Sequence, residues 1–96
     1  MSKRITLAEL PPTVTDLLAA ITEALTVPLP TISDADERAY HRLLEQRTTD
    51  VRIYLATMLD FPDVDITVDA AKIRARAAIT PVTYSLYEAE QDGGQK

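Results

Sequence analysis

The stretch "SDADERAYHRLLEQRTTDVRIYLATMLDFP", residues 33–62, decides the fold because it predicts one long helix. Ser33 is a favourable N-cap residue, and the acidic side chains that follow it suit the positive end of a helix dipole. The helical pattern continues to Leu59, and Pro62 stops the helix after Phe61, since proline breaks the backbone hydrogen bonding. The predicted helix is about 40 Å long at a rise of 1.5 Å per residue.

An apolar stripe follows this helix. Its members are spaced by four and three residues, which places them on one helical face, where we expect the flanking helices to pack. The middle of the stripe, "EQRTTD", contains no apolar residue, and only the methyl group of Thr48 fills the seam. Three explanations stay open: the central turns face solvent, the helix kinks there, or a polar layer faces a partner. The stripe comprises Leu44, Thr48, Val51, Leu55 and Met58, widened by Tyr40, Leu43, Tyr54 and Leu59.

The segments before the long helix are shorter. "TVTDLLAAITEAL", residues 13–25, repeats apolar residues with a helical period and predicts an amphipathic helix. Pro28 and Pro30 end that helix and form a stiff linker. "ITLAEL", residues 5–10, predicts either one helical turn with Thr6 and Glu9 as a capping box or an extended arm.

The segments after the long helix allow two interpretations each. Residues 63–69 alternate apolar and polar side chains, as a short strand or an extended linker does, but Thr67 could instead cap a following helix. Thr80 and Pro81 form a favourable helix start, and we expect a last helix there. The alternation of Val82, Tyr84 and Leu86 would also suit a strand, and the expected helix turns Val82 and Leu86 inward.

Size and composition indicate an all-α protein, a small single-domain helical bundle with one long central helix and short flanking helices. The chain has 96 residues, of which 46% are apolar, so one domain over residues 1–91 is expected, with 92–96 as a flexible tail. Cysteine is absent, which excludes disulfides and a thiol nucleophile. The only glycines are Gly93 and Gly94, which excludes glycine-rich phosphate loops.

The charge and hydropathy of the chain favour a cytoplasmic location. The net charge of −5 makes nucleic acid an unlikely partner, because phosphate backbones select cationic surfaces. No apolar run approaches the roughly 20 residues that span a bilayer, and the first residues lack the apolar core of a secretory signal. We therefore expect no membrane partner.

Residues 69–90 offer the main alternative function. "ITPVT" resembles the turn of bacterial helix-turn-helix segments, which implies a small DNA-binding regulator. The second helix of that pair would carry no Lys or Arg and two glutamates, so its charge opposes phosphate binding. The side chains that would contact DNA in this alternative are Lys72, Arg74, Arg76, Thr83 and Tyr84.

Catalytic and metal-binding patterns are weak. Glu37, His41 and Glu45 lie near one helical face at a spacing that can share a metal, but all three come from a single helix. Pairing between charged neighbours on the helix surface explains them as well. We expect no enzyme activity, no metal and no cofactor.

The favoured hypothesis is a non-enzymatic protein–protein interaction or assembly module, which is oligomeric through the long helix. Such a helix is difficult to cover with the short helices of so small a chain. Either self-association or a protein partner would cover it, and a small acidic inhibitor or antitoxin is a further alternative. The interface expected on the long helix comprises Tyr40, Leu44, Arg47, Val51, Tyr54, Leu55 and Met58.

Overall fold

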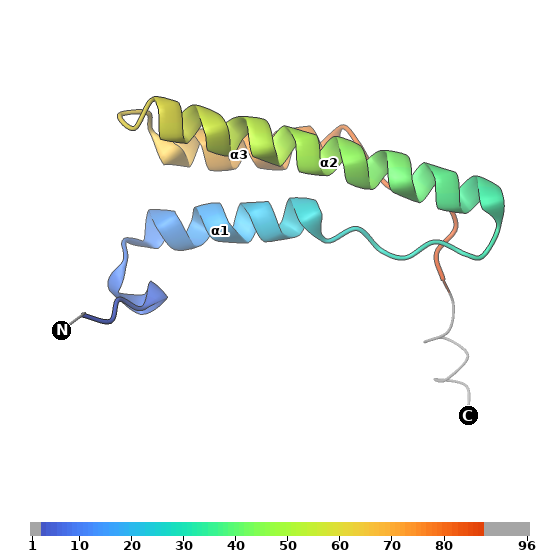
Figure 1. Ribbon diagram of the computed structural model, residues 1–96, viewed down its shortest axis with the longest axis horizontal. Helices are drawn as coiled ribbons and strands as arrows, with labels where there is room; N and C mark the ends of the chain where they lie inside the picture. The colour runs from blue at the N-terminus through green and yellow to red at the C-terminus, as the bar shows by residue number, and fades with distance from the viewer. Residues whose placement is uncertain (1–2, 88–96) are drawn as a thin grey trace.

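The computed structural model describes residues 3–87, and three α-helices make up most of this part (Figure 1). They are α1 (Pro12–Leu25), α2 (Asp34–Asp60) and α3 (Ile66–Ala78), and the 3₁₀ turn η1 (Leu7–Glu9) precedes them. Helices α1 and α3 run in the same direction, and α2 runs antiparallel to both. The expected all-α fold with a long central helix is confirmed. The expected tail, residues 92–96, lies outside the described residues.

Helix α2 begins and ends as its sequence indicates. The Ser33 hydroxyl oxygen accepts a hydrogen bond from the backbone N–H of Asp36 at 3.1 Å, which caps the first turn. The helix then continues unbroken through the polar middle to Asp60, and Phe61 follows as its C-cap. The interpretation of a kink or break in "EQRTTD" is therefore wrong.

Small side chains let α1 and α3 pack closely together. Ala20 of α1 and Ala70 of α3 are both fully buried in the shared core, and such small side chains allow the backbones of the two helices to approach each other closely. Ile73 of α3, 2% exposed, and Leu17 of α1 fill the space beside them. Val51 of α2 closes the same apolar cluster, so one core joins all three helices.

The buried face of α2 differs from the expected stripe. Leu43, Arg47 and Val51 are its buried residues, so Arg47 and not Thr48 occupies the seam. Glu45, Gln46, Thr48 and Thr49 are exposed, as the solvent-facing explanation requires, but Arg47 turns inward. A long arginine side chain can pack its methylene stem in a core when its charged head finds acceptors.

The connection from α2 to α3 contains no strand. Helix α3 begins at Ile66, so the alternation over residues 63–69 does not form an extended segment over its whole length. The N-cap is Asp65, whose carboxylate accepts from the backbone N–H of Thr67 at 3.0 Å. The interpretation in which Thr67 caps the helix placed the helix start two residues too late.

The expected last helix is wrong for residues 81–87, which form an irregular segment with a bend at Tyr84 and no helical turn. This segment runs beside residues 26–33, the linker between α1 and α2, and forms an antiparallel bridge between Pro30 and Leu86. The backbone N–H of Thr31 donates to the Ser85 carbonyl at 3.1 Å, and the N–H of Tyr87 donates to the Leu29 carbonyl at 2.9 Å. These hydrogen bonds to the linker take the place of the backbone hydrogen bonds that the expected helix would have formed. Val82 and Leu86 are exposed rather than turned inward.

The N-terminal segment combines both expected arrangements. Residues Leu7–Glu9 form only a 3₁₀ turn, flanked by extended backbone at Thr6 and Leu10. The Thr6 hydroxyl donates to the Glu9 carboxylate at 3.3 Å, but it does not cap the turn. Within residues 3–87, no helix has the length and apolar character that crossing a membrane requires.

Candidate functional site

Arg47 is a buried cation that forms no ion pair within the described residues. Its side chain is 9% exposed, and its guanidinium donates to four oxygen atoms. The Nε group donates to the Thr80 hydroxyl at 2.9 Å, and Nη1 donates to the Ala24 carbonyl at 2.9 Å. The Nη2 group donates to the carbonyls of Thr80 at 2.7 Å and Ala77 at 3.3 Å.

These acceptors lie where two helices end. Ala24 belongs to the last turn of α1, Ala77 belongs to the last turn of α3, and Thr80 follows α3 directly. Because α1 and α3 run parallel, the negative ends of both helix dipoles converge on the guanidinium. Dipoles and carbonyls thus replace the carboxylate that usually accompanies a buried arginine. Arg47 fixes the ends of α1 and α3 against the middle of α2.

Arg47 does not pair with Asp50, which follows it three residues later on α2. Asp50 instead contacts Arg76 of α3 at 3.4 Å. The informative signal was the spacing of Leu43, Arg47 and Val51 by four residues each, which places the arginine between two core positions.

Tyr84 anchors the C-terminal segment to the linker. It is 8% exposed, and its hydroxyl donates to the Pro28 carbonyl at 2.6 Å. Its ring meets that of Tyr40 edge to face, with the centroids 6.0 Å apart. Burial, and to a lesser degree the neighbouring Tyr40, raises the pKa of the Tyr84 hydroxyl. Tyr84 is therefore a packing residue in this structure.

The residues expected at an interface on α2 divide into two groups. Arg47 and Val51 are buried within the chain itself, and Tyr54 and Met58 pack against the same core. Leu55 is 38% exposed and remains accessible. Tyr40 and Leu44 are half-buried.

The residues of the DNA-binding alternative do not form a cationic surface together. Arg74 contacts Glu23 and Asp16 of α1, each at 3.0 Å, and the hydrogen bonds that its guanidinium donates to these two carboxylates raise its pKa. Arg76 contacts Asp50, as described above. Lys72 and Thr83 are exposed, but the helix that would carry Thr83 and Tyr84 into a groove is absent from residues 81–87.

An exposed row of leucines runs along α1 and α2, which we call the α1–α2 flank. On α2, Leu55 and Leu59 are 38% and 82% exposed, and on α1, Leu18 and Leu25 are 43% and 39% exposed. Helix α3 lies on the other side, where it pairs with Asp16, Glu23 and Asp50, and Figure 1 shows it behind α2. No other helix of residues 3–87 covers this side. The α1–α2 flank comprises Leu18, Leu25, Leu44, Leu55 and Leu59.

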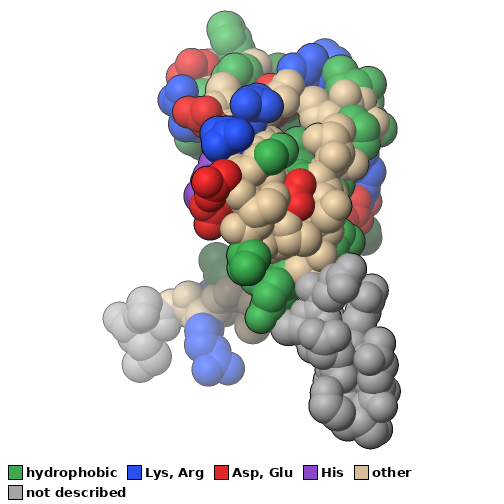
Figure 2. Space-filling model, turned by 90° about the vertical axis from the view of Figure 1, so that its right-hand side faces the viewer, with side chains coloured by type: hydrophobic (Ala, Val, Ile, Leu, Met, Phe, Trp, Pro, Cys, Tyr) green, Lys and Arg blue, Asp and Glu red, His purple; other side chains and the backbone are tan. Residues whose placement is uncertain are grey.

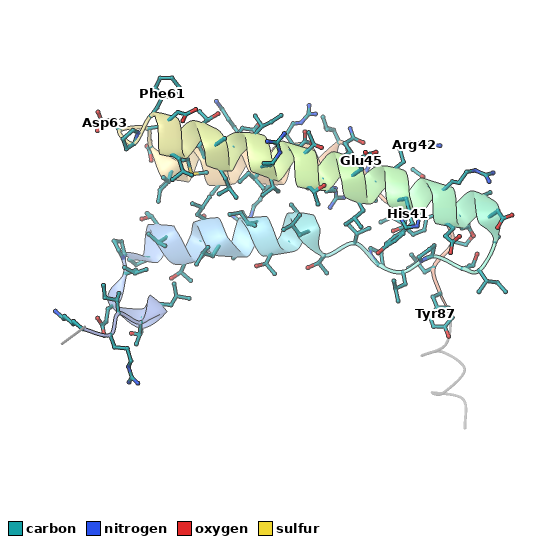
Figure 3. The ribbon with its side chains drawn as sticks, viewed as in Figure 1. His41, Arg42, Glu45, Phe61, Asp63 and Tyr87 are labelled. Atoms are coloured by element: carbon teal, nitrogen blue, oxygen red, sulfur yellow. The ribbon has the colours of Figure 1, made fainter. Side chains whose placement is uncertain are left out.

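The candidate metal ligands on α2 do not come together. Across residues 3–87, no cluster of three or more His, Cys, Asp or Glu side chains is suitably placed to hold a metal ion. His41 and Glu37 line one hollow of the surface, whereas Glu45 and Arg42 line another. Figure 3 labels His41, Arg42 and Glu45 along the first half of α2.

Comparison with known proteins leaves the function to be argued from this geometry. No family model, no curated protein and no solved structure matches the chain.

Proposed function

We propose that this protein is a non-enzymatic assembly module that self-associates through the α1–α2 flank. The observation that supports the proposal is the row of exposed leucines on two neighbouring helices. Contiguous apolar surface of this kind marks interaction sites on soluble proteins, because its exposure to water is unfavourable. A second copy is the simplest occupant, since an apolar face is complementary to itself in a symmetric dimer.

The strength of such a dimer follows from the leucines that it covers. Five leucines on each copy would contribute about 1 kcal/mol each on average, because all except Leu59 are already more than half buried in the monomer. The sum of about 10 kcal/mol must exceed the cost of association, which is about 4–15 kcal/mol. The surplus is therefore at most about 6 kcal/mol, so the proposal predicts association at tens of micromolar concentration or above, rather than a permanent dimer.

Net charge distinguishes self-association from binding to a basic partner. Each copy carries a net charge of −5, so two copies repel each other at low ionic strength. Salt screens this repulsion, and self-association should strengthen as salt is added. Binding to a cationic partner, including the target of an acidic inhibitor, would weaken under the same conditions.

The test is sedimentation velocity on the wild type and on three variants. Leu55→Asp and Leu18→Asp each place a charge on the α1–α2 flank and should shift the protein to monomer. Ile53→Asp is the matched control, because Ile53 is also exposed (52%) but lies about 200° around α2 from Leu55. Circular dichroism confirms that each variant is folded.

Two results would contradict the proposal. A wild type that sediments as a monomer at high micromolar concentration removes self-association altogether. Equal dissociation by Ile53→Asp and Leu55→Asp would show that another surface forms the contact.

A further inference from the structure

A pocket of about 350 Å³ opens beside the first half of α2, where the α1–α2 linker and the end of the C-terminal segment pass it. Tyr40 and His41 of α2 and Tyr87 of the C-terminal segment bring three aromatic rings to it. Leu29 and Ile32 of the linker provide apolar wall, and Glu37 contributes one carboxylate. Figure 3 shows His41 on α2 and Tyr87 below it, on the side where the linker runs.

This combination of groups suits a cation on an apolar stem. Aromatic rings attract cations through their negative faces, most strongly where water is partly excluded. A single carboxylate then provides charge and orientation, while apolar walls accommodate methylene groups. The rings of Tyr40 and His41 are already set at an angle to each other, with centroids 5.1 Å apart and an interplanar angle of 63°.

The surroundings of the pocket carry negative charge. Asp34, Asp36 and Glu37 all lie in the first turn of α2, and together they outweigh the positive end of the helix dipole, about half a unit charge. Hydrogen bonds, chiefly from the hydroxyl of Thr31 in the pocket wall, lower the pKa of Asp36. Figure 2 views this end of the molecule and shows the histidine between acidic and basic side chains.

The nearest basic residue on the following turn does not enter the pocket. Arg42 lines a separate hollow with Glu45, Asp50 and Arg76, on another side of α2. Among the described residues that line the pocket, His41 is the one basic side chain, and none is a lysine or arginine.

We propose that this pocket binds the side chain of an arginine or lysine carried by a partner protein. The guanidinium or ammonium group lies against the aromatic rings and contacts the Glu37 carboxylate, and the methylene stem packs on Leu29 and Ile32. The net charge of −5 favours the approach of such a basic segment. None of the leucines of the α1–α2 flank lines the pocket, although Leu44 lies one turn along α2 from Tyr40 and His41. The inference therefore does not rest on self-association.

The test is a nuclear magnetic resonance titration of the full chain at neutral pH with acetyl-arginine amide. Saturable shifts are expected at Tyr40, His41 and Tyr87. Acetyl-citrulline amide, which has nearly the same shape without the charge, is the matched ligand and should bind more weakly or not at all. Lysine amide acetylated only at its α-amino group, which keeps the side-chain ammonium, should shift the same resonances.

Three variants locate the interaction. Glu37→Gln should weaken arginine binding about three- to fivefold, and Tyr87→Ala should weaken it by a similar factor. Glu45→Gln removes the same charge from the same helix outside the pocket and should leave binding unchanged. The unliganded spectra report whether each variant keeps the wild-type fold.

The proposal is overturned if citrulline amide binds as tightly as arginine amide, because the pocket would then recognise shape alone. It is also overturned if arginine amide gives no saturable shift at tens of millimolar, or if Glu37→Gln and Glu45→Gln weaken binding equally.

Discussion

Arg47→Met is the substitution that most directly tests how the three helices are held together. Methionine retains an unbranched apolar stem, so the packing of the side chain within the core changes little. The four hydrogen bonds to Thr80, Ala24 and Ala77 are lost together. Replacement of a buried ion pair by apolar residues is often harmless, but here the acceptors are mostly backbone carbonyls that remain in place.

The expected cost follows from those acceptors. The Ala77 carbonyl keeps the backbone N–H of Thr80 as a donor, but the carbonyls of Ala24 and Thr80 lose the guanidinium. Each buried carbonyl left without a donor costs about 1–3 kcal/mol, so we expect a total loss of about 3–5 kcal/mol. A domain of this size has a free energy of unfolding of about 5–14 kcal/mol. The melting temperature should therefore fall by about 15–30 °C.

Urea denaturation followed by circular dichroism measures this loss. Arg52→Met is the control, since Arg52 is exposed on the same helix, and it should change stability by less than about 0.5 kcal/mol. Should Arg47→Met fail to fold, Arg47→Lys supplies the measurement, because lysine keeps part of the donor set and should lose less. Equal stabilities of Arg47→Met and Arg52→Met would refute the reasoning.

Three further predictions concern single contacts, and each is read from urea or thermal unfolding. Tyr84→Phe removes the bond to the Pro28 carbonyl and should cost about 1 kcal/mol. Because the folded state raises the pKa of Tyr84, the stability that this hydroxyl contributes is complete below about pH 10 and is lost as pH rises through the folded pKa. The stability difference between the wild type and Tyr84→Phe should therefore shrink at alkaline pH, and a difference that stays constant there would count against this. Ala70→Leu overfills the contact between α1 and α3 and should cost about 1–3 kcal/mol, whereas Ala71→Leu at the exposed neighbouring position should not. Asp65→Ala removes the N-cap of α3 and should lower the unfolding midpoint more than Asp63→Ala does. Since hydrogen bonds from Thr67 lower the pKa of Asp65, the stability that this cap contributes is complete above the unfolded pKa of about 3.9 and is lost as pH falls through the folded pKa. The difference in unfolding midpoint between Asp65→Ala and Asp63→Ala should therefore shrink in acid, and an unchanged difference would be the contrary outcome.

The sequence was informative where local chemistry decides the structure. Ser33 and its acidic neighbours mark the start of α2, and Pro62 marks its end, within one residue of the observed bounds. The helical period of residues 13–25 likewise matches α1 at Pro12–Leu25. Both results depend on caps and periodicity, which act over a few residues.

Tertiary contacts decided the parts that the sequence left open. Pro81 can begin a helix, but pairing with the linker and burial of Tyr84 favour irregular, non-helical backbone. The spacing of Leu43, Arg47 and Val51 indicates a core position for Arg47, but its acceptors could not be predicted, because they come from the ends of two other helices. The pocket residues share no sequence motif, because Leu29, Tyr40 and Tyr87 come from three separate segments.

The most direct test of the central claim is the mass of the wild-type protein in solution. Sedimentation equilibrium measures this mass over a range of protein concentrations and at two salt concentrations. Self-association through the α1–α2 flank predicts an average mass that rises above the 10.6 kDa of one chain with concentration, and rises further when salt is added. A mass that stays at 10.6 kDa up to high micromolar concentration in both salts would contradict it.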